Sequence, residues 1–162
     1  MPQPSAATLA AQVGDKVRPS ATLEVGRSYS LGSQAMLRPF GELRGGVETY
    51  ARVGVELVFG AGRHGDLLVR DPVTGFRYRT AGQAPRGASL LLGADIAKVW
   101  DSTYLPKDLG YTLTDTRNRL RAGVNWQGDS WSMFYGLTWL GREFVGQSDD
   151  QITGAIHVDV SF

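Results

Sequence analysis

The residue types that most often carry catalysis or bind metals are scarce in this sequence. It has no cysteine and two histidines, His64 and His157, among 162 residues. Disulfides, thiolate zinc sites, cysteine nucleophiles and histidine-rich metal sites are therefore excluded. His157 and Asp159 would share one face of a strand, where a general-base pair is conceivable. No nucleophile stands beside them, so we expect an interior hydrogen bond instead.

Two further patterns suggest an enzyme or a metal site. Asp149 and Asp150, beside Ser148, offer the carboxylate oxygens that calcium prefers. Adjacent acids of a strand point in opposite directions and supply too few ligands, so we expect a solvated loop. The nucleophile-elbow context of a hydrolase is missing around Ser89, Ser102, Ser130 and Ser132. The sequence therefore supports no catalytic residue, no cofactor-binding residue and no metal ligand.

Gly60, Gly62 and Gly65 match the glycine spacing of a dinucleotide-binding loop and follow a predicted strand. Such a loop must lead into a helix, whose N-terminus binds the pyrophosphate. Residues 66–70 and the Pro-Gly turn after them have no helical pattern. We therefore expect these glycines to lie in a flexible loop.

Arg117, Arg119 and Arg121 would project from one face of a strand. This spacing suits a nucleic-acid or phosphate patch, and contact with lipid phosphates would require a position at a rim. The chain has 17 Lys and Arg against 16 Asp and Glu, so its net charge of +1 gives no general attraction for nucleic acid. We expect the three arginines to be neutralised by acids of other strands, namely Glu48, Glu56 and Asp95.

The elements that would position these residues are long β-strands. Glycine accounts for 21 of the 162 residues, about twice the usual share. Residues 47–59 alternate without interruption, with Val53, Val55 and Leu57 on one face and Arg52 and Glu56 on the other. This alternation is more than double the length of an average strand of a soluble protein. Six further strands are predicted at about 18–29, 35–45, 89–101, 117–127, 131–142 and 156–162.

These strands have the properties of membrane-spanning strands. A spanning strand needs about 9–11 tilted residues that are apolar outward and polar inward. Aromatic residues lie near strand ends or on apolar faces, as the girdles of such barrels require: Trp100, Trp126, Trp131, Tyr135 and Trp139. Inward arginines and glutamates would be costly in the dry core of a soluble β-sandwich, which is the alternative fold. We therefore predict an all-β, antiparallel transmembrane β-barrel segment of about seven strands.

The rest of the chain divides into a lead segment and connections. Residues 1–16 are predicted to be a short helix or disordered, and the barrel segment covers 17–162. Residues 1–12 lack the basic start and apolar run of a signal peptide. The longest connection, residues 60–87, contains a predicted hairpin with arms at 67–70 and 76–80, which we place outside the bilayer because its arms are short. The chain ends on Phe162, in the form of a closing strand that barrel-assembly machinery recognises.

Several segments resemble the outer-membrane lipid A 3'-O-deacylase family. They are Arg-Pro-Phe-Gly-Glu-Leu-Arg-Gly-Gly-Val-Glu-Thr-Tyr-Ala at 38–51, Tyr-Gly-Leu-Thr-Trp at 135–139, Arg-Glu-Phe-Val-Gly-Gln at 142–147 and the closing residues 154–162. The resemblance covers most of 20–162 and corresponds to the C-terminal half of a family member. It implies a twelve-stranded barrel in the bacterial outer membrane, with the bilayer and lipid A as partners. It also implies calcium-dependent hydrolysis of an acyl ester of lipid A.

The catalytic apparatus of that family has no match in this chain. Family members carry an Asn-Asp pair and a catalytic histidine ahead of the matched region, and no Asn-Asp dipeptide occurs here. We therefore carry over no catalytic or calcium-binding residue, and whether the chain is an enzyme stays open. Seven strands are an odd number, whereas bacterial barrels have even numbers. Closure would need a missing N-terminal half or a second copy. The rival functions are a non-catalytic structural or porin-like barrel and, if the apolar faces pack against each other, a soluble β-sandwich binding module.

Overall fold

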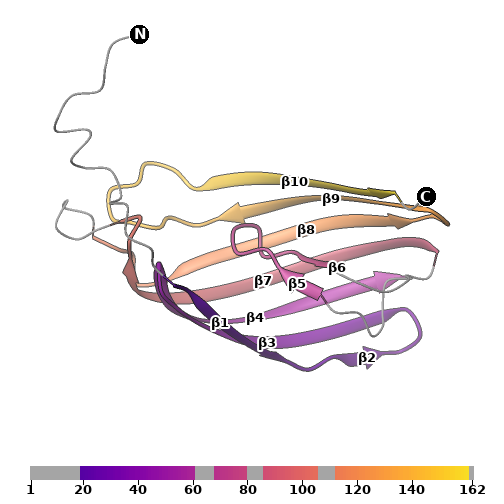
Figure 1. Cartoon of the computed structure of the whole chain (residues 1–162), viewed down its shortest axis with the longest axis horizontal. Coiled ribbons are helices and arrows are strands. Elements are labelled where there is room, and N and C mark those ends of the chain that lie inside the picture. Colours follow the sequence, from indigo (N-terminus) through magenta and orange to yellow (C-terminus); the bar gives the residue numbers. More distant parts are fainter. Residues whose placement is uncertain (1–18, 61–67, 80–85, 106–111, 161–162) are drawn as a thin grey trace, which may run out of the picture.

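The structure, a computed structural model, describes residues 19–60, 68–79, 86–105 and 112–160. All regular secondary structure in these ranges is β-strand, and the strands form two antiparallel sheets (Figure 1). No helix in the described ranges is long and apolar enough to cross a membrane. The predicted all-β antiparallel class is therefore confirmed. The lead segment at 1–16, His64 and Phe162 lie outside the described residues.

The main sheet has the strand order β1-β3-β4-β7-β8-β9-β10, and β2 also pairs with β3. Its strands are β1 (Ala21–Gly26), β2 (Tyr29–Leu31), β3 (Ala35–Gly45), β4 (Glu48–Gly60), β7 (Gly87–Ser102), β8 (Arg117–Gln127), β9 (Trp131–Leu140) and β10 (Gln151–Val160). The second sheet is a hairpin of β5 (Leu68–Arg70) and β6 (Arg77–Arg79), close to the arms that the sequence predicts.

β1 and β2 occupy the same side of β3, one after the other. β1 pairs with the second half of β3 and β2 with its start, and the amide of Arg27 between them donates to the carbonyl of Pro39 at 3.2 Å. The main sheet therefore has seven strand positions side by side, which agrees with the seven strands predicted from alternation.

The last strand begins earlier than predicted. The alternation places its start at Ile156, whereas β10 starts at Gln151 and pairs along its whole length with β9. Gln151 and Thr153 are polar, and Gly154 has no side chain, so the alternation is invisible in this first half. The antiparallel register nevertheless continues through it, with Thr153 opposite Thr138 and Gly154 opposite Leu137.

The main sheet is strongly curved and is not closed (Figure 1). Within the described residues, the outer edges of β1 and β10 have no neighbouring strand. The hairpin of β5 and β6 lies across the inner side of the curve, over the middle strands (Figure 1). This side, which carries Arg52, Asp95, Arg119, Arg121 and Thr138, is called the polar face below, and the opposite side is called the apolar face.

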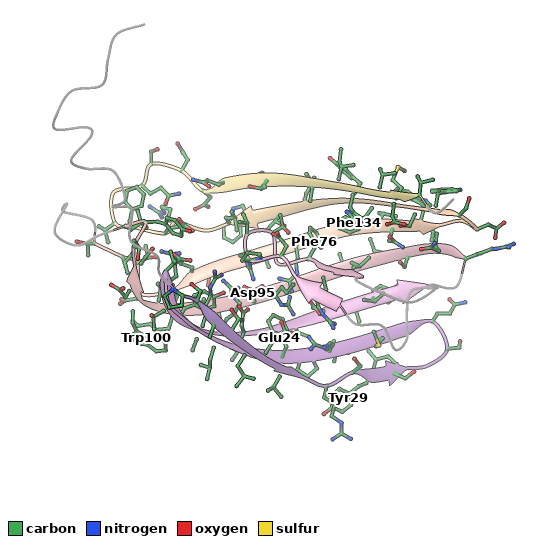
Figure 2. The ribbon with its side chains drawn as sticks, viewed as in Figure 1. Glu24, Tyr29, Phe76, Asp95, Trp100 and Phe134 are labelled. Carbon is green, nitrogen blue, oxygen red and sulfur yellow. The ribbon has the colours of Figure 1, made fainter. Side chains whose placement is uncertain are left out.

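The two faces show the reverse of the burial found in a soluble sheet. Along β8, Arg119 is 4% exposed, Leu120 is 55% exposed and Arg121 is 5% exposed. Along β4, Arg52 is buried and its neighbour Val53 is exposed. Figure 2 shows Tyr29 and Trp100 projecting from the outer side, while Asp95, Phe76 and Phe134 lie on the inner side. The structure therefore buries charged and aromatic side chains on the polar face and leaves the aliphatic side chains of the apolar face largely uncovered.

Candidate functional site

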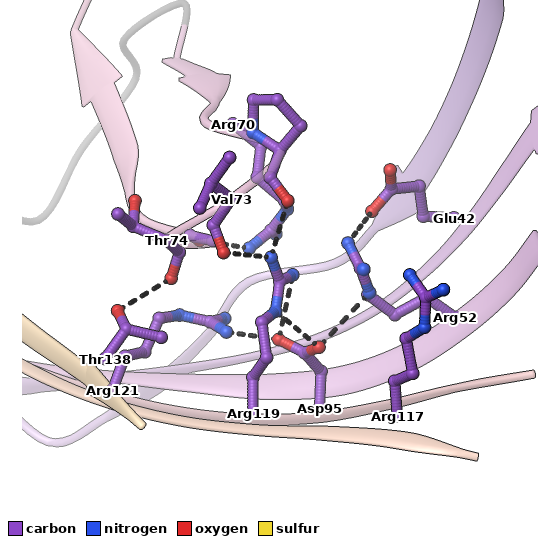
Figure 3. Close-up of polar contacts among 12 residues, drawn as sticks. Glu42, Arg52, Arg70, Val73, Thr74, Asp95, Arg117, Arg119, Arg121 and Thr138 are labelled. Atoms are coloured by element: carbon purple, nitrogen blue, oxygen red, sulfur yellow. Dashed lines mark hydrogen bonds and ion pairs between the residues drawn. The ribbon is translucent and has the colours of Figure 1, made fainter. Parts of the chain in front are cut away.

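The polar face is organised around two carboxylates, and the first is the buried Asp95 of β7. Its side chain is fully buried. One carboxylate oxygen is 2.9 Å from Nε of Arg119 and 3.2 Å from Nε of Arg52. The other accepts from Nη2 of Arg119 at 3.2 Å and from Arg121 (Figure 3). The carboxylate of Asp95 thus joins arginines from β4 and β8 across β7. The attraction between these charges is screened little because water is excluded.

The second carboxylate is that of Glu56 in β4, which is 12% exposed and connects the sheet to the hairpin. Its oxygens lie 2.6 Å from Arg70 of β5, 3.5 Å from Arg77 of β6 and 3.1 Å from Arg121 of β8. Arg38 of β3 lies 3.6 Å away. Arginines from both arms of the hairpin and from the main sheet therefore share the carboxylate of Glu56.

Arg70 is the most heavily engaged residue of the hairpin. Its Nε donates to Glu24 of β1 at 2.6 Å, and its guanidinium carbon lies 3.8 Å from the centroid of the Phe40 ring. Burial acts to lower the pKa of Arg70, but the hydrogen bond to Glu24 and the charge of Glu56 outweigh it, so the pKa lies above its usual value. Burial lowers the pKa of Arg77, which has weaker carboxylate contacts.

The turn between the two arms is stabilised by hydrogen bonds to the side chain of its first residue, Asp71. Oδ1 of Asp71 accepts from the amides of Val73 and Thr74, at 3.1 and 2.6 Å, and from the hydroxyl of Thr74 at 2.8 Å. Gly75, with a φ of +75°, completes the turn and donates its amide to the carbonyl of Asp71. This local bonding leaves the carbonyl groups of the turn free to face the sheet.

Those carbonyl groups are bound by side chains of the sheet. Nη1 of Arg119 donates to the carbonyls of Pro72 and Val73, at 2.9 and 3.0 Å. The hydroxyl of Thr138 donates to the carbonyl of Thr74 at 2.9 Å (Figure 3). The turn therefore adds acceptors to those that the carboxylates supply. Seven arginines, two of them in the hairpin, form ion pairs with six acids here: Arg38, Arg52, Arg70, Arg77, Arg117, Arg119 and Arg121 with Glu24, Glu42, Glu48, Glu56, Asp95 and Glu143.

Phe76 anchors the hairpin in a hollow of the sheet. It is 2% exposed and its ring stands edge-on to Phe134, with centroids 4.7 Å apart. The hollow is made by Gly123 and Gly136, where an added Cβ would lie 3.1 and 2.6 Å from the Phe76 ring. Any larger residue at Gly136 would force the ring out, so these two glycines provide the space for the hairpin.

The predicted neutralisation of three arginines is confirmed. Arg117 lies 3.0 Å from Glu48, Arg119 2.9 Å from Asp95, and Arg121 3.1 Å from Glu56. The buried position of Arg119 and Arg121 leaves them no surface for a nucleic acid. A smaller cluster extends the network, in which the Tyr50 hydroxyl donates to Glu42 at 2.6 Å and the Ser102 hydroxyl to Glu48 at 2.8 Å.

The other candidate residues of the sequence are not brought together. His157 and Asp159 lie in β10 on the polar face, opposite Phe134 and Ser132 in the register. Asp149 and Asp150 lie in the exposed connection between β9 and β10, and Gly62 and Gly65 are outside the described residues. In the described ranges, no group of three or more acids and histidines is placed to hold a metal ion.

Sequence reasoning missed the hairpin's place on the polar face and its contacts with Thr138 and Arg119. One signal pointed to it, because Gly123 and Gly136 leave a gap in adjacent strands at the same register position.

Comparisons with known proteins identify no family for this chain. No protein-family model matches it, and no curated protein or solved structure is significantly similar to it. The resemblance to lipid A deacylases is therefore carried by the sequence segments alone.

Proposed function

We propose that this chain forms part of the wall of a bacterial outer-membrane β-barrel of the lipid A deacylase type. The apolar face would lie against lipid and the polar face would line the interior. The observation that carries the proposal is the reversal of burial, seen most clearly at Arg119, Leu120 and Arg121. Exposed aliphatic side chains are favourable only against a nonpolar partner, and lipid is the partner that suits a continuous face across seven strand positions.

The length of the apolar face supports a bilayer. On β9 it runs from Trp131 to Trp139, which is about 26 Å along the strand, or about 20 Å of depth at a tilt of ~40°. The apolar band of an outer-membrane barrel is about 25 Å tall, with aromatic residues at both borders. Trp126 lies at the same end of the sheet as Trp131, and Trp100 lies at the opposite end.

The strand directions indicate what closes the barrel. Seven antiparallel positions give the two edge strands, β1 and β10, the same direction. Closure by antiparallel pairs alone therefore needs an odd number of additional strands, and five would give the twelve of the resembling family. A second copy in the same membrane orientation would place β10 parallel to the partner's β1. Additional strands from the same barrel are thus favoured over a second copy.

The resemblance implies calcium-dependent ester hydrolysis for the complete barrel, and we assign no residue of this chain to that reaction. Calcium takes six to eight oxygen ligands. The buried acids of the polar face are each engaged by arginine, whose positive charge opposes a second cation. The described residues therefore do not fit a calcium ion, and their contribution is the wall and its packed interior.

A porin-like barrel is the second candidate, favoured by one observation. A wall lined with arginines suits the passage of anions, and seven arginines on the polar face or in the hairpin over it form ion pairs with acids. Against this candidate, the hairpin covers the middle of that wall.

The proposal is tested by locating the protein and assaying lipid A. The full protein should be recovered in outer membranes, require detergent for extraction and show a heat-modifiable gel mobility. Calcium-dependent release of fatty acid from lipid A would then separate the deacylase from the passive barrel. Recovery as a monodisperse protein in detergent-free buffer would overturn both and favour the soluble β-sandwich.

A further inference from the structure

We infer that the hairpin of β5 and β6 is an interior plug, inserted from the periplasmic end, that closes the barrel to ions and solutes. The inference rests on the proposed function, because an interior exists only if the sheet is the wall of a barrel. It goes beyond that function in assigning a role to a segment that neither the deacylase nor the porin-like candidate requires.

The surface between the hairpin and the sheet is dry. Thr138 is 0% exposed, Phe76 2% and Arg119 4%, and each of them contacts a residue on the other side of the boundary between the sheet and the hairpin. A wall that borders a water-filled channel would leave such polar groups hydrated. Here the hydroxyl of Thr138 and the guanidinium of Arg119 have exchanged water for main-chain carbonyls of the turn.

The hairpin is held at several independent points. Arg70 links it to β1 and β4 through Glu24 and Glu56, Arg119 links it to β8, and Thr138 links it to β9. The Phe76 ring fills the hollow between Gly123 and Gly136. Charge-assisted bonds of this kind are stronger than neutral ones, and truncating one partner leaves a buried charge or donor unpaired. The contacts are therefore those of a fixed element rather than of a loop passing over the sheet.

The end from which the hairpin enters follows from the register. Gly60 pairs with Ser89, Gly87 with Gln127, and Trp131 with Val160, so the chain leaves the sheet after Gly60 and returns to it at Gly87, at the end where β10 finishes. The other connections at that end are short, at residues 32–34 and 128–130. The opposite end has the longer connections 103–116 and 141–150 in addition to the two-residue turn at 46–47. Outer-membrane barrels have short periplasmic turns and longer extracellular loops. The hairpin therefore enters from the periplasmic end.

The plug is tested by recording ion conductance of the full protein, extracted from outer membranes and reconstituted in planar bilayers. We expect the wild type to be silent and a variant with residues 68–79 replaced by a short Gly-Ser linker to conduct in discrete steps. Phe76→Ala should give intermittent openings. Val73→Ala is the matched control, because Val73 lies in the same turn with its side chain 56% exposed, and it should stay silent.

Wild-type conductance equal to that of the linker variant would overturn the plug while leaving the barrel proposal intact. Failure of the wild type to insert, judged by loss of heat-modifiable mobility, would overturn the proposed function itself. Absence of ion conductance in a linker variant that has inserted would also contradict the plug proposal. If the linker variant does not insert, the Phe76→Ala and Val73→Ala pair decides: openings in both or in neither contradict the proposal.

The direction of entry is tested separately with single cysteines, which the cysteine-free chain allows. Val145→Cys lies in the connection between β9 and β10, where Val145 is 66% exposed, and should react with a membrane-impermeant maleimide on intact cells. Ser130→Cys lies in the exposed turn at the end from which the hairpin enters, so it should be protected on intact cells and should react once the outer membrane is permeabilised. Labelling of Ser130→Cys on intact cells, or protection of Val145→Cys there, would contradict a plug that enters from the periplasmic end.

Discussion

Thr138 of β9 donates a hydrogen bond of 2.9 Å from its hydroxyl to the main-chain oxygen of Thr74 in the hairpin turn. Neither residue is charged, and the bond joins β9 to a residue of the hairpin turn that lies 64 positions earlier in the chain. A main-chain oxygen is presented in this direction only by the particular conformation that Asp71 imposes on the turn. The bond therefore connects the local conformation of the hairpin to its position on the sheet.

Replacing Thr138 by valine should loosen the hairpin without changing the shape of the strand. Valine has the same shape but no hydroxyl, so the buried carbonyl of Thr74 would lose its partner, at a cost of ~1–3 kcal/mol. Hydrogen exchange of the amides of Asp71 and Gly75, which bond within the turn, should accelerate correspondingly. The matched control is Thr114→Val, because the Thr114 hydroxyl also donates to a carbonyl, that of Arg142, but in an exposed position. Equal exchange in the two variants would contradict a docked hairpin.

Replacing Gly136 by alanine should displace the Phe76 ring. An added Cβ would lie 2.6 Å from that ring, closer than real contacts allow, and the ring or the strand must move. The near-ultraviolet circular dichroism of the aromatic side chains near Phe134 should change. The reconstituted protein should also gain the ion conductance expected when the plug is displaced. Gly154→Ala is the control, because its nearest neighbour is Leu137 at 3.8 Å. A silent Gly136→Ala variant with an unchanged spectrum would mean that the ring does not occupy the hollow.

The strands of the sheet were predictable because apolar and polar residues alternate along each of them, so that a short stretch of sequence shows which residues share a face. In residues 117–127, alternation alone separates Arg119 and Arg121 from Leu120, and the structure buries the first two and exposes the third. The acids that neutralise them were predictable by the same logic, because opposite charges on a common face of neighbouring strands pair with one another. Only the first half of β10 escaped this approach, since Gln151, Thr153 and Gly154 show no alternation.

The position of the hairpin was not predictable from alternation. Its contacts use main-chain carbonyls, which every residue has, and the residues that bind them are about 46 to 64 positions away. The short arms led us to expect residues 60–87 outside the bilayer, which stays a prediction. The sequence did not indicate that the hairpin of β5 and β6 lies on the polar face, where Arg119 and Thr138 contact it. Phe76 looks in the sequence like an ordinary strand residue, and only Gly123 and Gly136 together explain its burial.

Replacing Asp95 by asparagine should destabilise the wall strongly. The fully buried carboxylate of Asp95 contacts Arg52, Arg119 and Arg121, and its loss would leave these guanidinium groups without their shared counter-charge. Breaking a buried ion pair from one side typically costs ~3–5 kcal/mol. The urea midpoint for loss of heat-modifiable mobility should fall. The control is Asp115→Asn, because Asp115 is 99% exposed beside Lys98, and an exposed pair contributes only ~0–1 kcal/mol. Similar midpoints for both variants would show that the polar face is wet.

Replacing Leu137 by arginine should separate the membrane barrel from a soluble sheet. Leu137 belongs to an aliphatic row across the apolar face, with Ala122, Leu92 and Leu57 at the same height in the register. Leu137 lies inside the apolar band of β9, between Tyr135 at its centre and Trp139 at its border. Arginine costs ~2–4 kcal/mol at the middle of the bilayer and ~0–1 kcal/mol near the interfaces, so we expect a cost between these limits at Leu137. In water the same change would be nearly neutral, because Leu137 is already 45% exposed.

The control for Leu137→Arg is Leu43→Arg, in the row of Leu43, Ala51 and Lys98, where a charge already lies on the apolar face. Urea titration of the protein in lipid vesicles should show a large loss of stability for Leu137→Arg and a small one for Leu43→Arg. The difference should follow depth in the bilayer, because the two substitutions are chemically identical and both residues are exposed in the isolated sheet. Equal and small losses would mean that the apolar face lies against water or protein, and the barrel proposal would then be wrong.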